Sequence, residues 1–240
     1  MWLGEKMEIK FYPKNDIVRQ VIPSPKPVRV PSWFKDIPNY TNNNRLIVEN
    51  GQTNYSVKSC VPFLDTFSTG YVFELWCDVQ VRYENGMPVF RWLTGSDINI
   101  ELDPVASRRD AMLPIDDNYF PFNFSWISYW GIQTPKGYSC LFTHPLNRTD
   151  LPFITTSGVM DTDGWGIWGN QPFALKRGWQ GIIESGTPII QFIPFKREVW
   201  NSTVINDAKI SNEANIENLR ITSKFRGYYK NKYWNRKEYR

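Results

Sequence analysis

Short runs of β-branched and aromatic residues, separated by turn residues, fill the middle of this sequence and restrict the folds open to it. The longest run covers residues 71–82, and its second half alternates between apolar and polar side chains as a half-buried strand does. Asn85-Gly86 supplies a tight turn before another run at 89–93, which predicts a hairpin. Many short strands at this spacing predict a mainly β fold, a sandwich or barrel-like domain over residues 45–200. The further expected strands are residues 98–102, 124–130, 139–143, 173–176, 181–183 and 188–195.

The segments that flank this β domain differ from it in composition. Residues 1–44 are rich in proline, which fixes φ and removes a backbone donor, so we expect an extended arm with a helical turn at 32–35. Residues 201–223 carry apolar side chains at imperfect helical spacing and predict a short helix. Residues 224–240 form a tail of basic and aromatic residues.

Cysteine and histidine are too few for several kinds of site. Cys60, Cys77 and Cys140 are odd in number and widely spaced, so we expect no disulfide framework and a reduced intracellular setting. His144 is the single histidine, which excludes metal sites built on several histidines of one chain. We expect it to be a hydrogen-bonding residue at a strand end rather than a catalytic one.

No apolar run approaches the roughly 18 residues of a membrane-spanning helix, so no membrane partner is expected.

Three stretches in order resemble the motifs of the trimeric deoxyuridine triphosphatases (dUTPases). Residues 68–75 (STGYVFEL) resemble the opening motif, 157–163 (SGVMDTD) the Gly-Val-Ile-Asp motif, and 185–192 (SGTPIIQF) the strand that ends in Gln-Leu. Between them, residues 134–138 and 145–148 lie where the family has a turn and its Pro-Arg-Ser segment. The resemblance covers residues 65–197 and implies a β-clip fold that assembles as a trimer.

The resemblance also implies roles for individual residues. The family's motif carboxylate orients water at a nucleotide phosphate, and Asp161 is its counterpart in this sequence. Arg148 corresponds to the motif arginine and Gln191 to the structural glutamine, while Gly164 or Trp165 occupies the place of the sugar-stacking tyrosine. As ligand-binding residues the resemblance therefore indicates Arg148, Gln191 and Trp165, with Mg²⁺ held mainly by the substrate.

The sequence departs from the family at several of its functional positions. Val72 stands where the opening motif has aspartate, Thr149 follows the motif arginine in place of serine, and the glycine-rich C-terminal arm is replaced by the basic tail. Asp161 and Asp163 could hold Mg²⁺ through oxygen ligands two residues apart, but Asp-Thr-Asp-Gly is also typical of a turn, which we favour. The resemblance thus favours the fold and the trimer over the activity.

A second resemblance covers nearly the whole chain. Residues 22–25, 31–35, 60–65 and 193–198 resemble a family common in large tailed phages of marine bacteria, which brings no assigned catalytic residues. It implies a viral protein of the host cytoplasm that is associated with the virion if it takes part in assembly.

The tail carries the most concentrated charge in the chain. Its seven basic residues and one acid amount to +6, whereas residues 1–223 amount to −2. Basic and aromatic side chains at this density fit either an acidic protein neighbour, which we favour, or the phosphates and bases of nucleic acid. The tail residues expected to bind such a partner are Lys224, Arg226, Lys230, Lys232, Trp234, Arg236, Lys237 and Arg240.

Aromatic residues make up 16% of the chain and leave a further alternative open. We expect most tryptophans to pack in the core or between subunits, although some could stack on bases or sugars. The set consists of Trp126, Trp130, Trp165, Trp168, Trp179 and Trp200.

Together these patterns predict a non-enzymatic phage assembly protein that forms a homo-oligomer, with a trimer favoured, and that contacts other phage proteins through its arms. The first alternative is a dUTPase-like hydrolase of nucleotide phosphates that uses Asp161. The second is a module that binds nucleic acid or glycan. No cofactor is expected, except Mg²⁺ if the hydrolase alternative holds.

Overall fold

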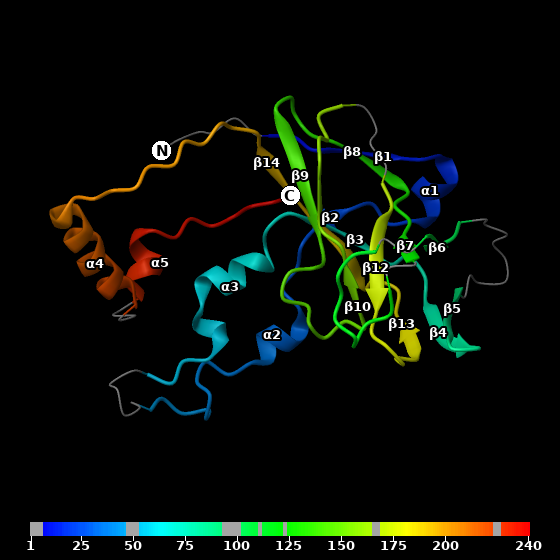
Figure 1. Ribbon diagram of the computed structural model, residues 1–240, viewed down its shortest axis with the longest axis horizontal. Helices are drawn as coiled ribbons and strands as arrows, with labels where there is room; N and C mark the ends of the chain where they lie inside the picture. The colour runs from blue at the N-terminus through cyan, green and yellow to red at the C-terminus, as the bar shows by residue number, and fades with distance from the viewer. Residues whose placement is uncertain are drawn as a thin grey trace. The chain divides into compact units, whose positions relative to one another are not determined.

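The structure is a computed structural model, and it divides the chain into two compact units. Unit 1 consists of Met1–Val28, Gly70–Arg197 and Arg240, and unit 2 of Arg29–Thr69 and Glu198–Tyr239. The strands labelled in Figure 1 belong to unit 1, and helices α2 to α5 belong to unit 2. The residues that the structure describes are 7–46, 53–92, 102–109, 112–121, 124–164, 169–222 and 227–240.

Unit 1 is built from four antiparallel sheets, so the predicted mainly β fold of many short strands is confirmed. The five-stranded sheet has the order β11 (Gly158–Met160), β9 (Tyr138–Thr143), β14 (Pro188–Lys196), β3 (Tyr71–Glu74) and β2 (Lys26–Pro27). The four-stranded sheet has the order β10 (Phe153–Thr155), β12 (Gln171–Leu175), β7 (Phe124–Trp126) and β6 (Val105–Ser107). The smaller sheets are β13 (Gly181–Ile183), β4 (Val79–Glu84) and β5 (Met87–Trp92), and β1 (Lys10–Pro13) with β8 (Trp130–Gln133). None of these sheets, as far as their strands are described, closes into a barrel.

Large aromatic side chains fill the core of unit 1. Trp126 is fully buried and stacks on Phe173 with ring centroids 3.9 Å apart, and Phe153 meets its edge at 4.8 Å. Its indole Nε1 donates to Thr155 Oγ1 at 3.1 Å, and that hydroxyl donates to the Ile189 carbonyl at 2.7 Å, so the polar atoms of these two side chains are paired. The expected core role is confirmed for Trp126.

The remaining tryptophans of the predicted set divide between other environments. Trp130 is buried and donates to the Ile22 carbonyl at 3.2 Å, and Trp179 is half-buried. Trp200 is 85% exposed, so it is not a core residue of the single chain, and its packing between subunits stays a prediction. Trp165 and Trp168 lie outside the described residues.

The predicted strand at residues 71–82 is wrong in one respect, because the chain forms two strands there. β3 pairs with β14 and β4 pairs with β5 and β13, in different sheets. Leu75 lies at the junction, almost fully buried, with its N–H bonded to the Thr187 carbonyl at 2.8 Å. The hydrogen bond of Leu75 to the 184–187 segment therefore separates β3 from β4, although the composition of residues 71–82 is typical of a strand throughout. The hairpin around Asn85-Gly86 is confirmed.

Gly70 shows why the first motif needs glycine at its turn into β3. Its φ is +79°, and a Cβ on this residue would lie 2.2 Å from the Phe192 carbonyl oxygen. Any other residue would clash with the backbone of the neighbouring strand β14. The motif thus has a structural cause in the close approach of two strands.

The proline-rich segment is not extended throughout. It contains β1, helix α1 (Asp16–Val21), β2 and helix α2 (Ser32–Asp36), and α2 confirms the predicted helical turn. Asn15 caps α1 by accepting from the Val18 N–H at 2.9 Å. Prolines 13, 27 and 31 stand at the ends of these elements, where the missing N–H costs little.

Unit 2 holds η1 (Val57–Ser59), α3 (Val61–Thr66), α4 (Ala208–Thr222) and α5 (Tyr228–Lys232) besides α2. Phe34, Phe63 and Phe67 pack together with ring centroids 5.1 to 5.8 Å apart, and Trp33 meets Phe67 edge-on at 5.7 Å. The predicted C-terminal helix is confirmed as α4. It begins at 208 because the Asp207 carboxylate accepts from the Lys209 N–H at 2.8 Å. Within the described part of the chain, no helix is long and apolar enough to cross a membrane.

Candidate functional site

Asp161 lies directly after β11, where the chain leaves the edge of the five-stranded sheet. Its Oδ1 accepts from Ser139 Oγ at 2.6 Å and lies 3.1 Å from Arg197 Nη1. The Asp161 side chain is 72% exposed, so water reaches it. Ser139 is on β9 and Arg197 follows β14, so the two neighbouring strands bring both partners to the carboxylate.

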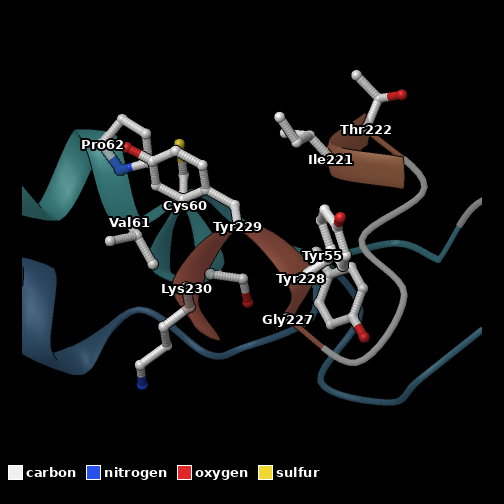
Figure 2. Close-up of a pocket in the computed structure, with 11 residues that line it drawn as sticks. Tyr55, Cys60, Val61, Pro62, Ile221, Thr222, Gly227, Tyr228, Tyr229 and Lys230 are labelled. Carbon is white, nitrogen blue, oxygen red and sulfur yellow. The ribbon is translucent and has the colours of Figure 1, made fainter. Parts of the chain in front are cut away.

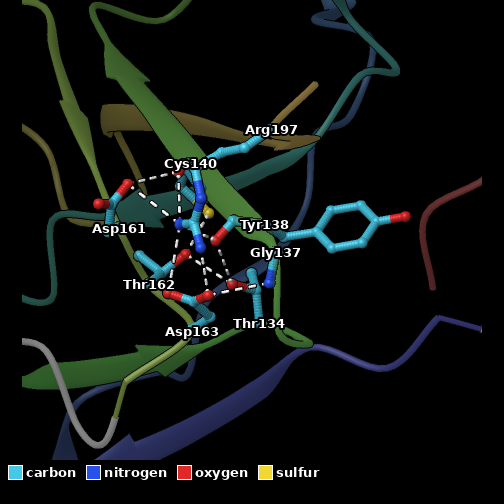
Figure 3. Close-up of polar contacts among 9 residues, drawn as sticks. Thr134, Gly137, Tyr138, Cys140, Asp161, Thr162, Asp163 and Arg197 are labelled. Atoms are coloured by element: carbon cyan, nitrogen blue, oxygen red, sulfur yellow. Dashed lines mark hydrogen bonds and ion pairs between the residues drawn. The ribbon is translucent and has the colours of Figure 1, made fainter. Parts of the chain in front are cut away.

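Arg197 is the centre of this cluster (Figure 3). Its guanidinium pairs with both oxygens of Asp163 and also donates to the Tyr138 carbonyl at 3.1 Å and to Ser139 Oγ at 3.0 Å. The Gly137 N–H donates to Asp163 Oδ2 at 2.9 Å. Hydrogen bonds from Arg197 and Gly137 lower the pKa of Asp163 to about 2, and the same ion pair raises the pKa of Arg197.

A buried layer beneath these charges holds the loop in place. Thr162 is fully buried, shares a hydrogen bond of 2.8 Å with the Thr134 hydroxyl and donates to Cys140 Sγ at 3.3 Å. Its carbonyl accepts from the Thr134 N–H at 2.9 Å. Burial raises the pKa of the Cys140 thiol to about 11, so the sulfur is neutral at physiological pH. Asp161 and Asp163 are therefore fixed on one rigid turn, with Thr162 as its anchor.

The Asp161–Asp163 pair does not fit a resident Mg²⁺. The Arg197 guanidinium lies between the two carboxylates and already pairs with both. A divalent cation that used both carboxylates would have to displace this internal cation. No group of three or more potential protein ligands of a metal occurs among the described residues.

A polar cavity of about 700 Å³ adjoins the same turn. Lys10 of β1, Lys136 of the turn before β9, Gln133 and Asp163 contribute to its walls. Its two lysines and its two carboxylates, Glu8 and Asp163, balance in charge. The cavity can accommodate a polar ligand beside the exposed face of the cluster.

Arg148 and Gln191 make structural contacts. Arg148 forms a two-pronged ion pair with Asp150, at 2.8 and 2.7 Å, rather than with the carboxylates around Arg197. Gln191 is almost fully buried in β14, and its Oε1 accepts from the Leu146 N–H at 2.8 Å. Trp165 lies outside the described residues.

The hydrogen bonds of its two ring nitrogens determine the tautomer of His144. The Thr155 N–H donates to Nδ1 at 3.3 Å, so Nε2 carries the proton and donates to the Arg148 carbonyl at 3.1 Å. Burial lowers the pKa of this imidazole. A neutral ring that bonds two backbone groups is structural, as its position at the end of β9 predicts.

The C-terminal tail makes several contacts within unit 2. Trp234 Nε1 lies 3.0 Å from both carboxylate oxygens of Asp65, and Lys237 Nζ donates to Asp65 Oδ2 at 2.7 Å. Lys232 Nζ donates to Glu217 Oε1 at 2.6 Å. Hydrogen bonds from Lys232, Tyr233 and Tyr228 lower the pKa of Glu217 to about 2.

The other basic residues of the tail have varied surroundings. Lys230 Nζ lies 6.0 Å from the Trp234 ring centroid, and Arg236 pairs with Glu238 at 3.9 Å. The carbonyl of Arg240 accepts from the Tyr71 hydroxyl at 3.4 Å. Lys224 and Arg226 lie outside the described residues.

Sequence reasoning missed Arg197, Ser139, Asp65 and Glu217. Arg197 was visible only as part of a strand end, and its pairing with Asp161 depends on β9 and β14 lying side by side. Asp65 stands 169 residues before Trp234, so no local pattern connects them. Only the expectation that the tail meets an acidic neighbour pointed toward carboxylates, and Asp65 and Glu217 are two carboxylates of the same chain that contact it.

Comparison with known proteins finds a likeness to phage dUTPases. No protein-family profile and no curated protein matches the chain. Two structures of the dUTPase from phage phi11 of S. aureus, one a mutant studied for a structural Mg(II) ion, match 54% of this chain and 97% and 96% of their own. A mutant dUTPase of Staphylococcus bacteriophage 80alpha with dUpNHpp matches 54% of this chain and 88% of its own. All three are 12% identical to this chain, with a TM-score of 0.27.

Proposed function

We propose that this chain is a non-enzymatic assembly protein that forms a homo-oligomer through the segment between β14 and α4. One observation carries the proposal. Val199, Trp200 and Val204 are 92%, 85% and 83% exposed in a stretch, residues 198–207, that has neither helix nor strand. Figure 1 shows this stretch as an extended trace between β14 and α4.

Burial of these exposed side chains in an interface would contribute a large hydrophobic free energy to association. Burying one tryptophan removes at least about 150 Å² from water, worth about 4 kcal/mol at 25 cal/mol per Å². Helix α4, which follows in the chain, adds further apolar surface, because none of its residues is buried and Ile210, Ile216 and Leu219 are exposed. An apolar surface spread over an extended segment and a helix is suited to contact a neighbouring subunit.

A second copy of this chain offers a fitting partner surface. β11 is an edge strand of the five-stranded sheet, and Val159 at its centre is 64% exposed. Extended segments bind such edges by adding a strand, with main-chain hydrogen bonds for affinity and side chains for specificity. Exchange of this segment around a ring leaves no unused surface in a closed oligomer, and the motif resemblance to the trimeric dUTPases is why we favour a trimer. Other phage proteins are further partners in this proposal.

Sedimentation analysis of the purified chain tests the proposal. We expect a species of three times 28.2 kDa for the wild type and a monomer for the variant Val199→Ser with Trp200→Ser. Met87→Ser, which removes an exposed apolar side chain from the β4–β5 hairpin, is the control and should leave the oligomer intact. A wild-type protein that sediments at 28.2 kDa at all concentrations would contradict the proposal.

A second candidate function is hydrolysis of a nucleotide phosphate, and the polar cavity beside the Arg197 cluster is the observation that favours it. Asp161 is an exposed carboxylate that could orient a water molecule, while Lys10 and Lys136 could contact an anionic substrate in the adjoining cavity. Pyrophosphate release from a panel of deoxynucleotides with Mg²⁺, lost in Asp161→Asn and kept in the exposed control Asp36→Asn, would replace the non-enzymatic proposal. Absence of release by the wild type would reject this candidate.

A further inference from the structure

Unit 2 contains a second cavity, of about 450 Å³, whose walls come from two segments far apart in the sequence (Figure 2). The described lining residues of one wall are Tyr55 and 59–62, and those of the other are 221–222 and 227–230. Its volume lies in the range of pockets that bind small organic molecules. The side chains that carry the argument are Tyr55, Cys60, Pro62, Ile221, Tyr228 and Tyr229.

The first wall is held in place by local structure. The Tyr55 ring stacks on Tyr40 with ring centroids 5.4 Å apart. The Ser56 hydroxyl accepts from the Lys58 N–H at 3.2 Å and caps η1, and the Cys60 N–H closes that turn on the Val57 carbonyl at 2.9 Å. This wall is therefore preformed, which reduces the entropy lost when a ligand binds.

The second wall depends on the tail. The Tyr228 hydroxyl donates to Glu217 Oε1 at 2.7 Å, which connects α5 to α4. The Trp234 N–H donates to the Tyr229 carbonyl at 3.0 Å, and the Trp234 indole is bonded to Asp65 on α3. The contact of Trp234 with Asp65 thus fixes the position of Tyr229 in the wall.

The lining indicates the chemistry of the ligand. Tyrosine rings and aliphatic groups predominate, the polar side chains include the hydroxyls of Ser59 and Thr222, and no carboxylate is among the described lining residues. Figure 2 shows the Lys230 ammonium pointing away from the other labelled side chains. Flat aromatic molecules gain from offset or edge contacts with such rings, and apart from Lys230 no charged side chain is among the described lining residues that could compensate a buried charge.

We propose that this cavity binds a small uncharged aromatic molecule and that the tail, held by Asp65, forms one of its walls. This site goes beyond the assembly function and does not depend on it. Because the ligand contacts both walls, its binding favours the attached tail, and detachment of the tail weakens binding by the same factor.

Cys60 provides a direct measure of occupancy, because its side chain lines the cavity and is exposed. Cys77 and Cys140 are buried, and burial raises their thiol pKa to about 12 and about 11. A maleimide reagent should therefore label Cys60 selectively in the folded protein. A ligand in the cavity should slow that labelling.

The experiment uses 5-fluoroindole as the probe, with binding followed by fluorine NMR and occupancy by the rate of Cys60 labelling. We expect saturable binding to the full chain and several-fold slower labelling of Cys60. Tyr229→Ala should weaken the affinity about tenfold, since the loss of a stacking ring costs about 1.4 kcal/mol. Tyr229→Phe keeps the ring and should bind as the wild type does.

Two further variants make the result decisive. Asp65→Asn should weaken probe binding because it loosens the tail, whereas Tyr83→Ala, in unit 1, should leave it unchanged. The proposal is overturned if 5-fluoroindole shows no saturable binding to the wild type, if binding leaves Cys60 labelling unaffected, or if Tyr229→Ala and Tyr83→Ala bind equally well.

Discussion

Residues 198–207 and residues 228–240 are both rich in large side chains, and the structure uses them in opposite ways. In the first segment Val199, Trp200 and Val204 extend into solvent. In the second, Trp234 and Lys237 are bonded to Asp65 within unit 2. The segment with the higher charge density is thus the one engaged inside the chain, and the less charged segment is the one that leaves apolar surface uncovered.

This difference changes what a basic, aromatic tail indicates. A concentration of cations suggests an external acidic partner, but Asp65 and Glu217 supply two carboxylates from the same chain. Exposed apolar surface is the better guide to an intermolecular contact. It stays in water in the folded chain, and it is buried only when another molecule binds to it.

Removal of the Asp65 carboxylate should change the stability of the chain more than any other substitution proposed for these two segments. Asp65→Ala leaves the Trp234 N–H and the Lys237 ammonium without their acceptor, at a site where the aspartate is only 13% exposed. We expect the free energy of unfolding to fall by about 3 kcal/mol, as for loss of one partner of a buried charged pair. Urea unfolding measures the change, with exposed Asp36→Ala as control; equal midpoints for the two variants would show that the tail is not anchored.

Trp234→Phe should have a smaller effect on the same anchor. The phenyl ring keeps the apolar contacts but cannot donate to Asp65, and a hydrogen bond to a charged group is worth about 1.5 kcal/mol or more. We expect a loss of stability near that lower value in urea unfolding. Combined with Asp65→Ala, the substitution should add almost nothing, and simple additivity would contradict a shared interaction.

Acid should weaken the contact between α4 and the tail through Glu217. Its pKa is lowered from 4.5 to about 2 by hydrogen bonds from Lys232, Tyr233 and Tyr228, so its contribution is complete above pH 4.5 and is lost as the pH falls through 2. We expect the difference in urea midpoint between wild type and Glu217→Gln to shrink over that interval. Glu213→Gln, on an exposed position of the same helix, should show no such trend.

Trp200→Ser should have the smallest effect on the stability of the single chain. Because the side chain is 85% exposed, we expect a change within about 0.5 kcal/mol in urea unfolding under dissociating conditions. Self-association measured by sedimentation should nevertheless weaken. A large loss of stability in the monomer would mean that Trp200 packs within its own chain, and the comparison between the two segments would fail.

Much of the β domain was predictable because its signals are local. Asn85-Gly86 forms a hairpin turn wherever strand-like runs flank it, and the alternation at residues 79–84 matches the burial of β4. The run at 71–82 was misread because strand composition does not reveal where a chain passes from one sheet to another. Helix α4 was expected too early, since the Asp207 cap rather than the apolar spacing determines its first residue.

The candidate site was predictable only in part for the same reason. The motif resemblance selected Asp161, and its acidic neighbour Asp163 was visible two residues later. Arg197, which neutralises both, is 34 residues beyond Asp163 and reaches it because β14 lies beside β9. The spacing of residues in the sequence does not reveal that a cation at the end of a distant strand will pair with these two carboxylates.

The sequence by itself determined the mainly β character of the chain, the turn at Asn85-Gly86 and the single basic tail, because these follow from backbone conformations and side-chain chemistry within a few residues. Tertiary structure alone decided which carboxylates meet which cations and which aromatic side chains are covered. Asp65 and Trp234 are 169 residues apart, and only the folding of Arg29–Thr69 with Glu198–Tyr239 into unit 2 brings them within 3.0 Å. The physical reason is that pairing and burial depend on distance in space, which a linear order of residues does not contain.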